Sequence, residues 1–454
     1  MELHCKLKCV FVWCMIAAVL KVYALFPLVI SGGLVAVYGG YLYKKHKLTA
    51  ADAIFFAAMM LNLWYVCSSW GNVRQHDYYN FVMFADYFVS NHFFVAPPVT
   101  YLKSVFYHPP FWGVITGVFM QFLEFDAVRL VSLFAIGGAY ILMWRFMERL
   151  KFREHIKWGL FSFYCFYPVH GLMSNWVNND AMVYFLMIAA VYTAYLWYED
   201  SSWKHTLIIS GLLLLAGMIK FSGLMVVPAV GMLMLFKLCE ARDKKSVALW
   251  SKFFVICMGA VLGFAWGIFL LYFRFKLLPP PMDVETQSMT AYSLVQRLFD
   301  FTGLLTPMIK FHELYQVEPN VWLTLIKTSL FGEWTWQGLI WASILYSISF
   351  VWLLLSAISF KALVLKPLGR GFALNAAVIL LFFAVLIAWI NFWLDYPFFC
   401  STEFRYTAIF LPLSVLWVGH YLNQKSLPKY MQYILAGCAA LMILSRFMLY
   451  LNTI

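Results

Sequence analysis

Apolar runs about as long as a membrane is thick recur along nearly the whole chain. Of its 454 residues, 63% are hydrophobic and only 12% are charged, whereas soluble globular chains carry about a quarter charged residues. Crossing a hydrocarbon core of ~30 Å as a helix takes about 20 apolar residues, and the backbone polar groups inside it must be hydrogen-bonded within the protein. The sequence therefore predicts an all-α, polytopic membrane protein and argues against a β-barrel.

The runs predict about 12–13 membrane-spanning helices. The expected spans are 5–22, 23–43, 50–69, 127–147, 156–173, 181–198, 204–219, 221–238, 250–274, 336–356, 372–392, 406–422 and 430–450. The first run lacks a small-residue cleavage site, so we expect no cleaved signal peptide. Because no internal repeat or soluble-domain linker is visible, we expect residues 1–454 to form one transmembrane domain.

Lysines and arginines predict the orientation of these helices. If the N-terminus is cytoplasmic, 21 of the 33 basic residues fall in short cytoplasmic loops or at cytoplasmic helix ends, as the positive-inside rule requires. Orientation thus explains most of the net charge of +12, and no basic stripe with interleaved aromatics indicates a nucleic-acid partner. The absence of an Asn-X-Ser/Thr sequon mildly favours a bacterial plasma membrane and leaves the endoplasmic reticulum open.

This orientation leaves two long loops, residues 70–126 and 275–335, on the extracytoplasmic face. The apolar stretch 110–124 in the first loop is long enough to be read as another span. Counting it would invert every later loop and place the basic segment 147–157 outside. We therefore expect a horizontal or re-entrant helix there, and we expect any chemistry on this face.

The first outer loop opens with "GNVRQHDYYNF", which carries Arg74, His76 and Asp77. Asp77 is either a solvated loop acid or a general base that takes a proton from an acceptor hydroxyl. Arg74 and His76 could tune that acid or hold an anion. The stretch alone does not decide between these interpretations.

Two further polar positions follow on the same face. In "FYHPPFWG" the prolines explain a rigid corner that starts a helix, but they do not explain His108, which can donate to a phosphate or a sugar hydroxyl. In "SNWVNNDAMVYF" Asp180 is either a helix cap or a site residue.

Three more charged residues sit beside apolar segments near this face. Lys220 in "GMIKFSGLMVVP" either snorkels to the interface or meets an anion, because an ammonium within apolar surroundings is costly. Glu333 lies among aromatics in "KTSLFGEWTW". Arg405 in "STEFRYTAIFLPL" is either a plain interfacial anchor or a bidentate ligand of a lipid phosphate.

The order of these segments resembles a known family. An acid in the first outer loop, then "YHPPF", "VNNDA", "KFSG" and a late "RY" before "LPL" are similar to the membrane glycosyltransferases of the GT-C fold. The nearest group is family 39, which includes protein O-mannosyltransferases and aminoarabinose transferases. The resemblance covers most of residues 50–415, and Tyr78 stands where the family often has a second acid.

The resemblance implies inverting transfer of a sugar from a polyprenyl-phosphate donor to a glycan, lipid or protein hydroxyl. Asp77 would be the base, while Arg405, Lys220 and His108 would stabilise the departing phosphate. GT-C enzymes that use a divalent ion gather acids from comparable loops, where this chain has Asp77, Asp180 and Glu333. These would suit Mg²⁺ or Mn²⁺, although family 39 members generally work without a metal, so we do not expect one to be required.

Two other classes of function remain open at this stage. A transporter or flippase for a lipid-linked sugar would also need outer cations and a membrane cavity, but it often shows inverted repeats and charges near the bilayer centre. A non-catalytic assembly subunit on the same scaffold would not need Asp77. Because the polar candidates gather on one face and no repeat is visible, we favour the enzyme.

Overall fold

A computed structural model gives the arrangement of the helices. It describes residues 49–69, 78–90, 108–122, 128–241, 246–269, 288–309, 311–312, 315–316, 318–333, 336–369, 371–425 and 429–451. Within these ranges the strands are limited to an antiparallel pair of two residues each, β1 (Phe311–His312) and β2 (Tyr315–Gln316). The predicted spans 5–22 and 23–43 and the segment with Arg74, His76 and Asp77 lie outside the described residues.

Seven helical segments in the described part are long and apolar enough to cross a membrane. They are α3 (Ala50–Ser68), α6 (Val128–Arg149), α9 (Asp180–Asp200), the continuous pair η4 (Phe221–Val226) and α11 (Val227–Glu240), α12 (Ser246–Ile268), α15 (Leu339–Leu365) and α16 (Ala373–Asp395). The remaining helices include α10 (Trp203–Ile219), α17 (Phe410–Gln424) and α18 (Lys429–Leu451). This confirms the predicted all-α, multi-pass class.

One predicted span is broken in two. The sequence predicts a single helix over 156–173, whereas the chain forms α7 (Glu154–Phe166) and α8 (Pro168–Asn175). Pro168 explains the break, since it has no N–H to donate and pushes the preceding residue away from helical geometry. Tyr167 accordingly has φ −60° and ψ 130°.

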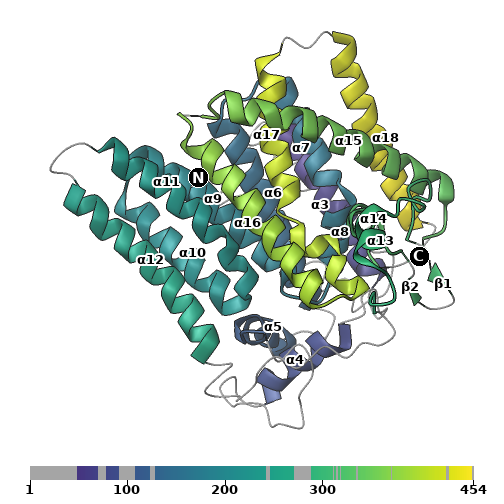
Figure 1. Cartoon of the computed structure of the whole chain (residues 1–454), viewed down its shortest axis with the longest axis horizontal. Coiled ribbons are helices and arrows are strands. Elements are labelled where there is room, and N and C mark those ends of the chain that lie inside the picture. The colour runs from purple at the N-terminus through teal and green to yellow at the C-terminus, as the bar shows by residue number, and fades with distance from the viewer. Residues whose placement is uncertain are drawn as a thin grey trace.

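The first long loop, residues 70–126, contributes two short helices, α4 (Tyr78–Ser90) and α5 (Phe111–Phe122). At 12 residues, α5 is about 18 Å long, too short to cross the hydrocarbon core. The two helices pack through aromatic side chains, with the Phe81 and Trp112 ring centroids 5.1 Å apart. Figure 1 shows them together at one end of the helical bundle.

The helix that leads to Lys220 is held by close packing. α10 runs along α12, where Gly259 and Gly263 allow the two backbones to approach. A Cβ at Gly259 would lie 2.2 Å from the Ser210 carbonyl oxygen, and one at Gly263 would lie 2.7 Å from the Leu214 carbonyl oxygen. Such small-residue contacts are typical of helix pairs in membranes, and they fix the position at which α10 ends.

A buried ion pair anchors the second long loop, residues 275–335. Lys327 on α14 (Val321–Phe331) pairs with Glu318, and both side chains are fully buried. The Lys327 ammonium also donates to the Gly303 carbonyl at 3.0 Å. From the same helix, the Thr328 hydroxyl accepts the backbone N–H of Phe404 at 2.9 Å. The loop is therefore tied to the segment that carries Arg405.

The long helices have two chemically distinct ends. α9 spans 21 residues, so its termini are about 30 Å apart. Asp180 begins it, and we call this the site end. Glu199 lies near its other terminus and pairs with Arg149 at 2.5 Å, while Lys252 donates to the Ser201 carbonyl at 2.5 Å. We call this second end, where many of the lysines and arginines expected in the cytoplasm gather, the basic end.

Candidate functional site

The first pair of candidate residues forms a buried ion pair. Asp180 is the first residue of α9, and Lys220 separates α10 from η4 with an extended backbone of φ −162°. Their side chains are 7% and 12% exposed and are in direct contact. The Lys220 ammonium thus meets an anion, and it does not simply snorkel to the interface, because a neighbouring carboxylate offsets the cost of burying it.

Local turns explain how these two residues meet. The Asp180 N–H donates to the Asn178 side-chain oxygen at 3.1 Å, which shapes the turn before α9. The Asn179 amide donates to the Ile219 carbonyl at 3.4 Å and so connects this turn to the end of α10. The "NNDA" segment therefore does more than cap α9, since it joins two helices that are about 40 residues apart in the chain.

Arg405 provides the second cation of the site. It lies on the short 3₁₀ turn η8 (Phe404–Thr407), just before α17, and its side chain is 6% exposed. Its Nε is 2.9 Å from Glu403 Oε2, and its Nη2 is 3.9 Å from Glu333 Oε1. Two carboxylates from different segments thus lie beside one guanidinium.

The ring of Tyr406 lies beside both cations. The Lys220 Nζ is 5.1 Å and the Arg405 Cζ is 5.2 Å from its centroid. These are cation–π distances. The aromatic face therefore links the Asp180–Lys220 pair to the Arg405 group and makes one site of them.

His108 is held next to these charges. Its ring stacks on Phe81, with centroids 5.9 Å apart and planes 13° from parallel. Burial lowers the pKa of His108 to about 3, and the charges of Lys220 and Arg405 act in the same direction. At neutral pH the imidazole is uncharged and retains one N–H with which to donate a hydrogen bond.

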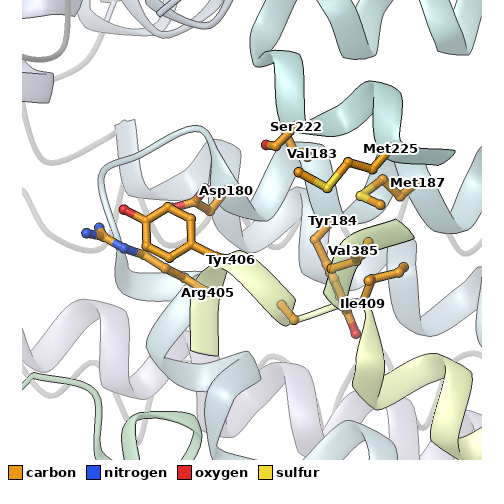
Figure 2. Close-up of a pocket in the computed structure, with 11 residues that line it drawn as sticks. Asp180, Val183, Tyr184, Met187, Ser222, Met225, Val385, Arg405, Tyr406 and Ile409 are labelled. Carbon is orange, nitrogen blue, oxygen red and sulfur yellow. The ribbon is translucent and has the colours of Figure 1, made fainter. Parts of the chain in front are cut away.

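A small cavity opens beside the cations. It is about 30 Å³ in volume, and its polar wall includes Asp180, Arg405, Tyr406 and Ser222. Its other walls are mostly apolar and are formed by Val183, Met187, Met225, Val385, Ala408 and Ile409, together with Tyr184. Figure 2 shows Asp180, Arg405 and Tyr406 on one side of the cavity, with Met187 and Met225 across from them.

Asp77, Arg74 and His76 lie outside the described residues, but both flanks of their segment contact one side chain. Arg129, buried in the first turn of α6, donates to the Ser69 carbonyl at 2.8 Å. Its Cζ lies 5.2 Å from the ring centroid of Tyr78. The same guanidinium donates to the Asn175 side-chain oxygen at 2.8 Å, near the turn that leads to Asp180.

Arg129, Glu403 and Tyr406 are site residues that the sequence reasoning missed. Glu403 lies two residues before Arg405, and Tyr406 directly follows it. Arg129 carried a signal, because an arginine near the start of the apolar run 127–147 needs a partner.

The acids of the site face cations. Within the described ranges, no three His, Cys, Asp or Glu side chains are grouped so that they could hold a metal ion. Asp180 contacts Lys220, and Glu333 faces Arg405. Because Asp180 and Glu333 already face positive charges, these two carboxylates are not arranged to hold Mg²⁺ or Mn²⁺. The third predicted ligand, Asp77, lies outside the described residues.

Comparison with known proteins gives a limited result. The crystal structure of ArnT from Cupriavidus metallidurans in the apo state is 15% identical, covers 76% of this chain and 72% of its own, and has a TM-score of 0.34. The structure of ArnT bound to undecaprenyl phosphate is 13% identical, covers 86% and 77%, and has a TM-score of 0.38. No family model and no curated protein matches the sequence. At such low TM-scores, the function has to be argued from the site itself.

Proposed function

We propose that this chain is a membrane glycosyltransferase of the GT-C type, which transfers a sugar from a polyprenyl-phosphate donor to an acceptor hydroxyl on the extracytoplasmic side. The observation that supports it is the convergence of Lys220 and Arg405 on the ring of Tyr406, each paired with a carboxylate. Arg405 lines the small cavity directly, and Lys220 contacts Asp180, which also lines it. The two cations are 185 residues apart in the sequence. Both lie at the site end of the molecule.

The two cations suit a departing phosphate. Charge-assisted hydrogen bonds to phosphate are short and strong, and Arg can engage two of its oxygens at once. Because Asp180 and Glu403 orient Lys220 and Arg405 beforehand, little reorganisation is needed as negative charge develops on the leaving group. His108, uncharged at neutral pH, adds an N–H donor without adding charge.

Asp77 serves as the base in this proposal. The acceptor oxygen attacks the anomeric carbon from the face opposite the phosphate, and its proton passes to the Asp77 carboxylate. The bond to the phosphate oxygen breaks with its electron pair staying on the phosphate, which leaves a polyprenyl phosphate and an inverted glycoside. Arg129 supports this role because it contacts the residues on both sides of the Asp77 segment.

The apolar walls of the cavity suit the first part of the donor's lipid. Met187 and Met225 face the cations across a space of about 30 Å³, which is smaller than a sugar phosphate. Methionine side chains are flexible and adapt to irregular ligands. We therefore expect the cavity to widen when the donor enters, with the methionines moving aside.

The test is a transfer assay with purified protein, a radiolabelled polyprenyl-phosphate sugar and a panel of acceptor hydroxyls. We expect sugar transfer with release of polyprenyl phosphate, and we expect Arg405→Ala to weaken donor binding more than acceptor binding. As a control, Arg297→Ala removes an arginine from the second outer loop that is not in the site. Movement of intact donor across the bilayer without bond cleavage would identify a flippase and contradict the proposal.

The side of the membrane is tested separately. Single cysteines at positions 77 and 151, introduced into a variant without native cysteines, should react with a membrane-impermeant maleimide from opposite sides. Position 77 should react from the extracytoplasmic side. Labelling of both positions from one side would refute the proposed orientation, whatever the result of the transfer assay.

A further inference from the structure

A second and larger cavity lies at the basic end. Its volume is about 590 Å³, which falls within the range of small-molecule binding sites. The end of α6, the connection between α15 and α16, and the end of α17 form its walls. The proposed sugar transfer uses none of these residues.

The charge of this cavity is mostly positive. Arg149, Lys151 and Lys366 line it, and Glu199 is the one acid among its lining residues. Glu199 is already paired with Arg149 at 2.5 Å. Lys151 and Lys366 are exposed, and no carboxylate of the described residues pairs with either ammonium. Two cations are therefore available to a ligand.

The wall that carries Lys366 is built rigidly. The Asn375 side chain accepts the Leu368 N–H at 2.7 Å and donates to the Lys366 carbonyl at 2.7 Å. Gly369 has φ +83°, and a Cβ there would lie 2.3 Å from the Tyr195 hydroxyl oxygen, so only glycine fits. Residues 366–369 are thus held in place by contacts within the protein.

Neutral polar groups complete the cavity. His420 Nε2 lies 3.1 Å from the Lys366 carbonyl and 2.7 Å from the Gln424 amide nitrogen. Asn423 also lines the space, and its side-chain oxygen accepts the Arg153 N–H at 2.9 Å. Amide groups and a histidine beside two lysines can hydrogen-bond a ligand that carries both phosphate oxygens and hydroxyls.

We propose that this cavity binds a phosphate ester, such as the head group of an anionic phospholipid. Three features support it: an excess of positive charge, a fixed concave wall, and a location at the helix ends. Basic pockets between transmembrane helices at the membrane surface attract anionic head groups. The same chemistry would accept a free phosphate compound from the aqueous phase.

The experiment uses the full-length protein in an uncharged detergent, titrated separately with dioctanoyl phosphatidylglycerol, dioctanoyl phosphatidylcholine and inorganic phosphate. Binding is measured by calorimetry for the wild type, for the double variant Lys151→Gln/Lys366→Gln, and for the control Lys204→Gln/Lys361→Gln. The control removes the same charge from exposed lysines that do not line the cavity. We expect the cavity variant to bind phosphatidylglycerol at least about tenfold more weakly and the control to change less than about twofold.

The outcomes separate the sources of the ligand. Saturable binding of phosphatidylglycerol, lost only in the cavity variant, supports a lipid head group. Equal binding of inorganic phosphate, lost in the same variant, supports the phosphate site with a free anion as its ligand. Absence of binding, binding of phosphatidylcholine with equal affinity, or equal losses in both double variants would overturn the proposal. None of these results depends on glycosyltransferase activity.

Discussion

Charged side chains are treated differently at the two ends of α9. At the site end, the side chains of Asp180 and Lys220 are 7% and 12% exposed. At the basic end, Asp200 pairs with His205 while 47% of its side chain remains exposed. The side chain of Arg149 is 49% exposed, although that of its partner Glu199 is only 7% exposed. Both members of the site-end pair are thus shielded from solvent, whereas each of these basic-end pairs keeps one member exposed.

This difference in the burial of charged side chains also implies a difference in energetic cost. Exposed ion pairs are worth about 0–1 kcal/mol, and they need no further explanation than membrane orientation. Burying charges costs several kcal/mol per ion before pairing, and apolar residues of similar size would often be at least as stable. A buried pair can be structural, as Glu318–Lys327 is, but at the site end two buried cations lie around the single ring of Tyr406. We therefore expect a ligand there, whereas most charges at the basic end serve topology.

The largest effect is expected for Asp77→Asn. Removing the base should lower turnover by about 10³-fold, within the range for general base catalysis, while donor binding persists. Asp86→Asn, which changes an exposed acid on α4, is the matched control. Turnover and donor affinity are measured in the transfer assay, and wild-type turnover of the Asp77 variant would remove the base assignment.

The buried pair gives the next effect. Lys220→Met leaves the Asp180 carboxylate buried without its cation, so we expect a loss of about 3–5 kcal/mol in unfolding free energy and at least about a 100-fold loss of turnover. The double variant Asp180→Asn/Lys220→Met should recover stability but not activity. Arg145→Met, which breaks a half-exposed pair, should cost about 1 kcal/mol or less. If the Lys220 and Arg145 variants lost equal amounts of unfolding free energy, the proposed difference between the site end and the basic end would be wrong.

Arg129 is expected to have a smaller, indirect effect. Arg129 is a positioning residue for the Asp77 segment. Arg129→Gln should therefore lower kcat by about tenfold and leave the donor KM within about twofold. Arg129→Lys should recover part of kcat by keeping the charge. A change confined to donor KM would instead place Arg129 in the donor site.

The smallest effect concerns His108 and pH. Its folded pKa of about 3 lies below the ordinary value of 6.5, so the unfolded chain binds more protons between these values. The stability from a neutral His108 is complete above pH 6.5 and is lost as the pH falls from 6.5 toward 3. His108→Gln should therefore reduce the fall in Tm between about pH 7.5 and about pH 4.5. An unchanged pH dependence would contradict the burial of this imidazole.

The sequence predicted where most helices lie because their signal is local. Apolar length indicated α6, α9 and α10 to within about two residues, but α15 ends nine residues later than predicted and α12 ends six residues earlier. The break at Pro168 was missed because the apolar run continues through it, although the proline itself was visible. The partners of Arg405 were beyond sequence reasoning, since Glu333 reaches it through α14, whose position depends on the Glu318–Lys327 pair. Such pairs depend on tertiary packing and produce no periodic pattern in the sequence.

The Asp180–Lys220 pair also has a consequence for biogenesis. Lys220 divides the apolar segment from Trp203 to Glu240, and a lysine within a membrane segment costs about 2.5–3.5 kcal/mol on insertion scales. Asp180 is synthesised 40 residues earlier, so in the proposed orientation it has already been exported when Lys220 must follow. The carboxylate can then receive the ammonium as the apolar segments on either side of Lys220 enter the bilayer. The residue pair would thus act first as an insertion aid and later as part of the site.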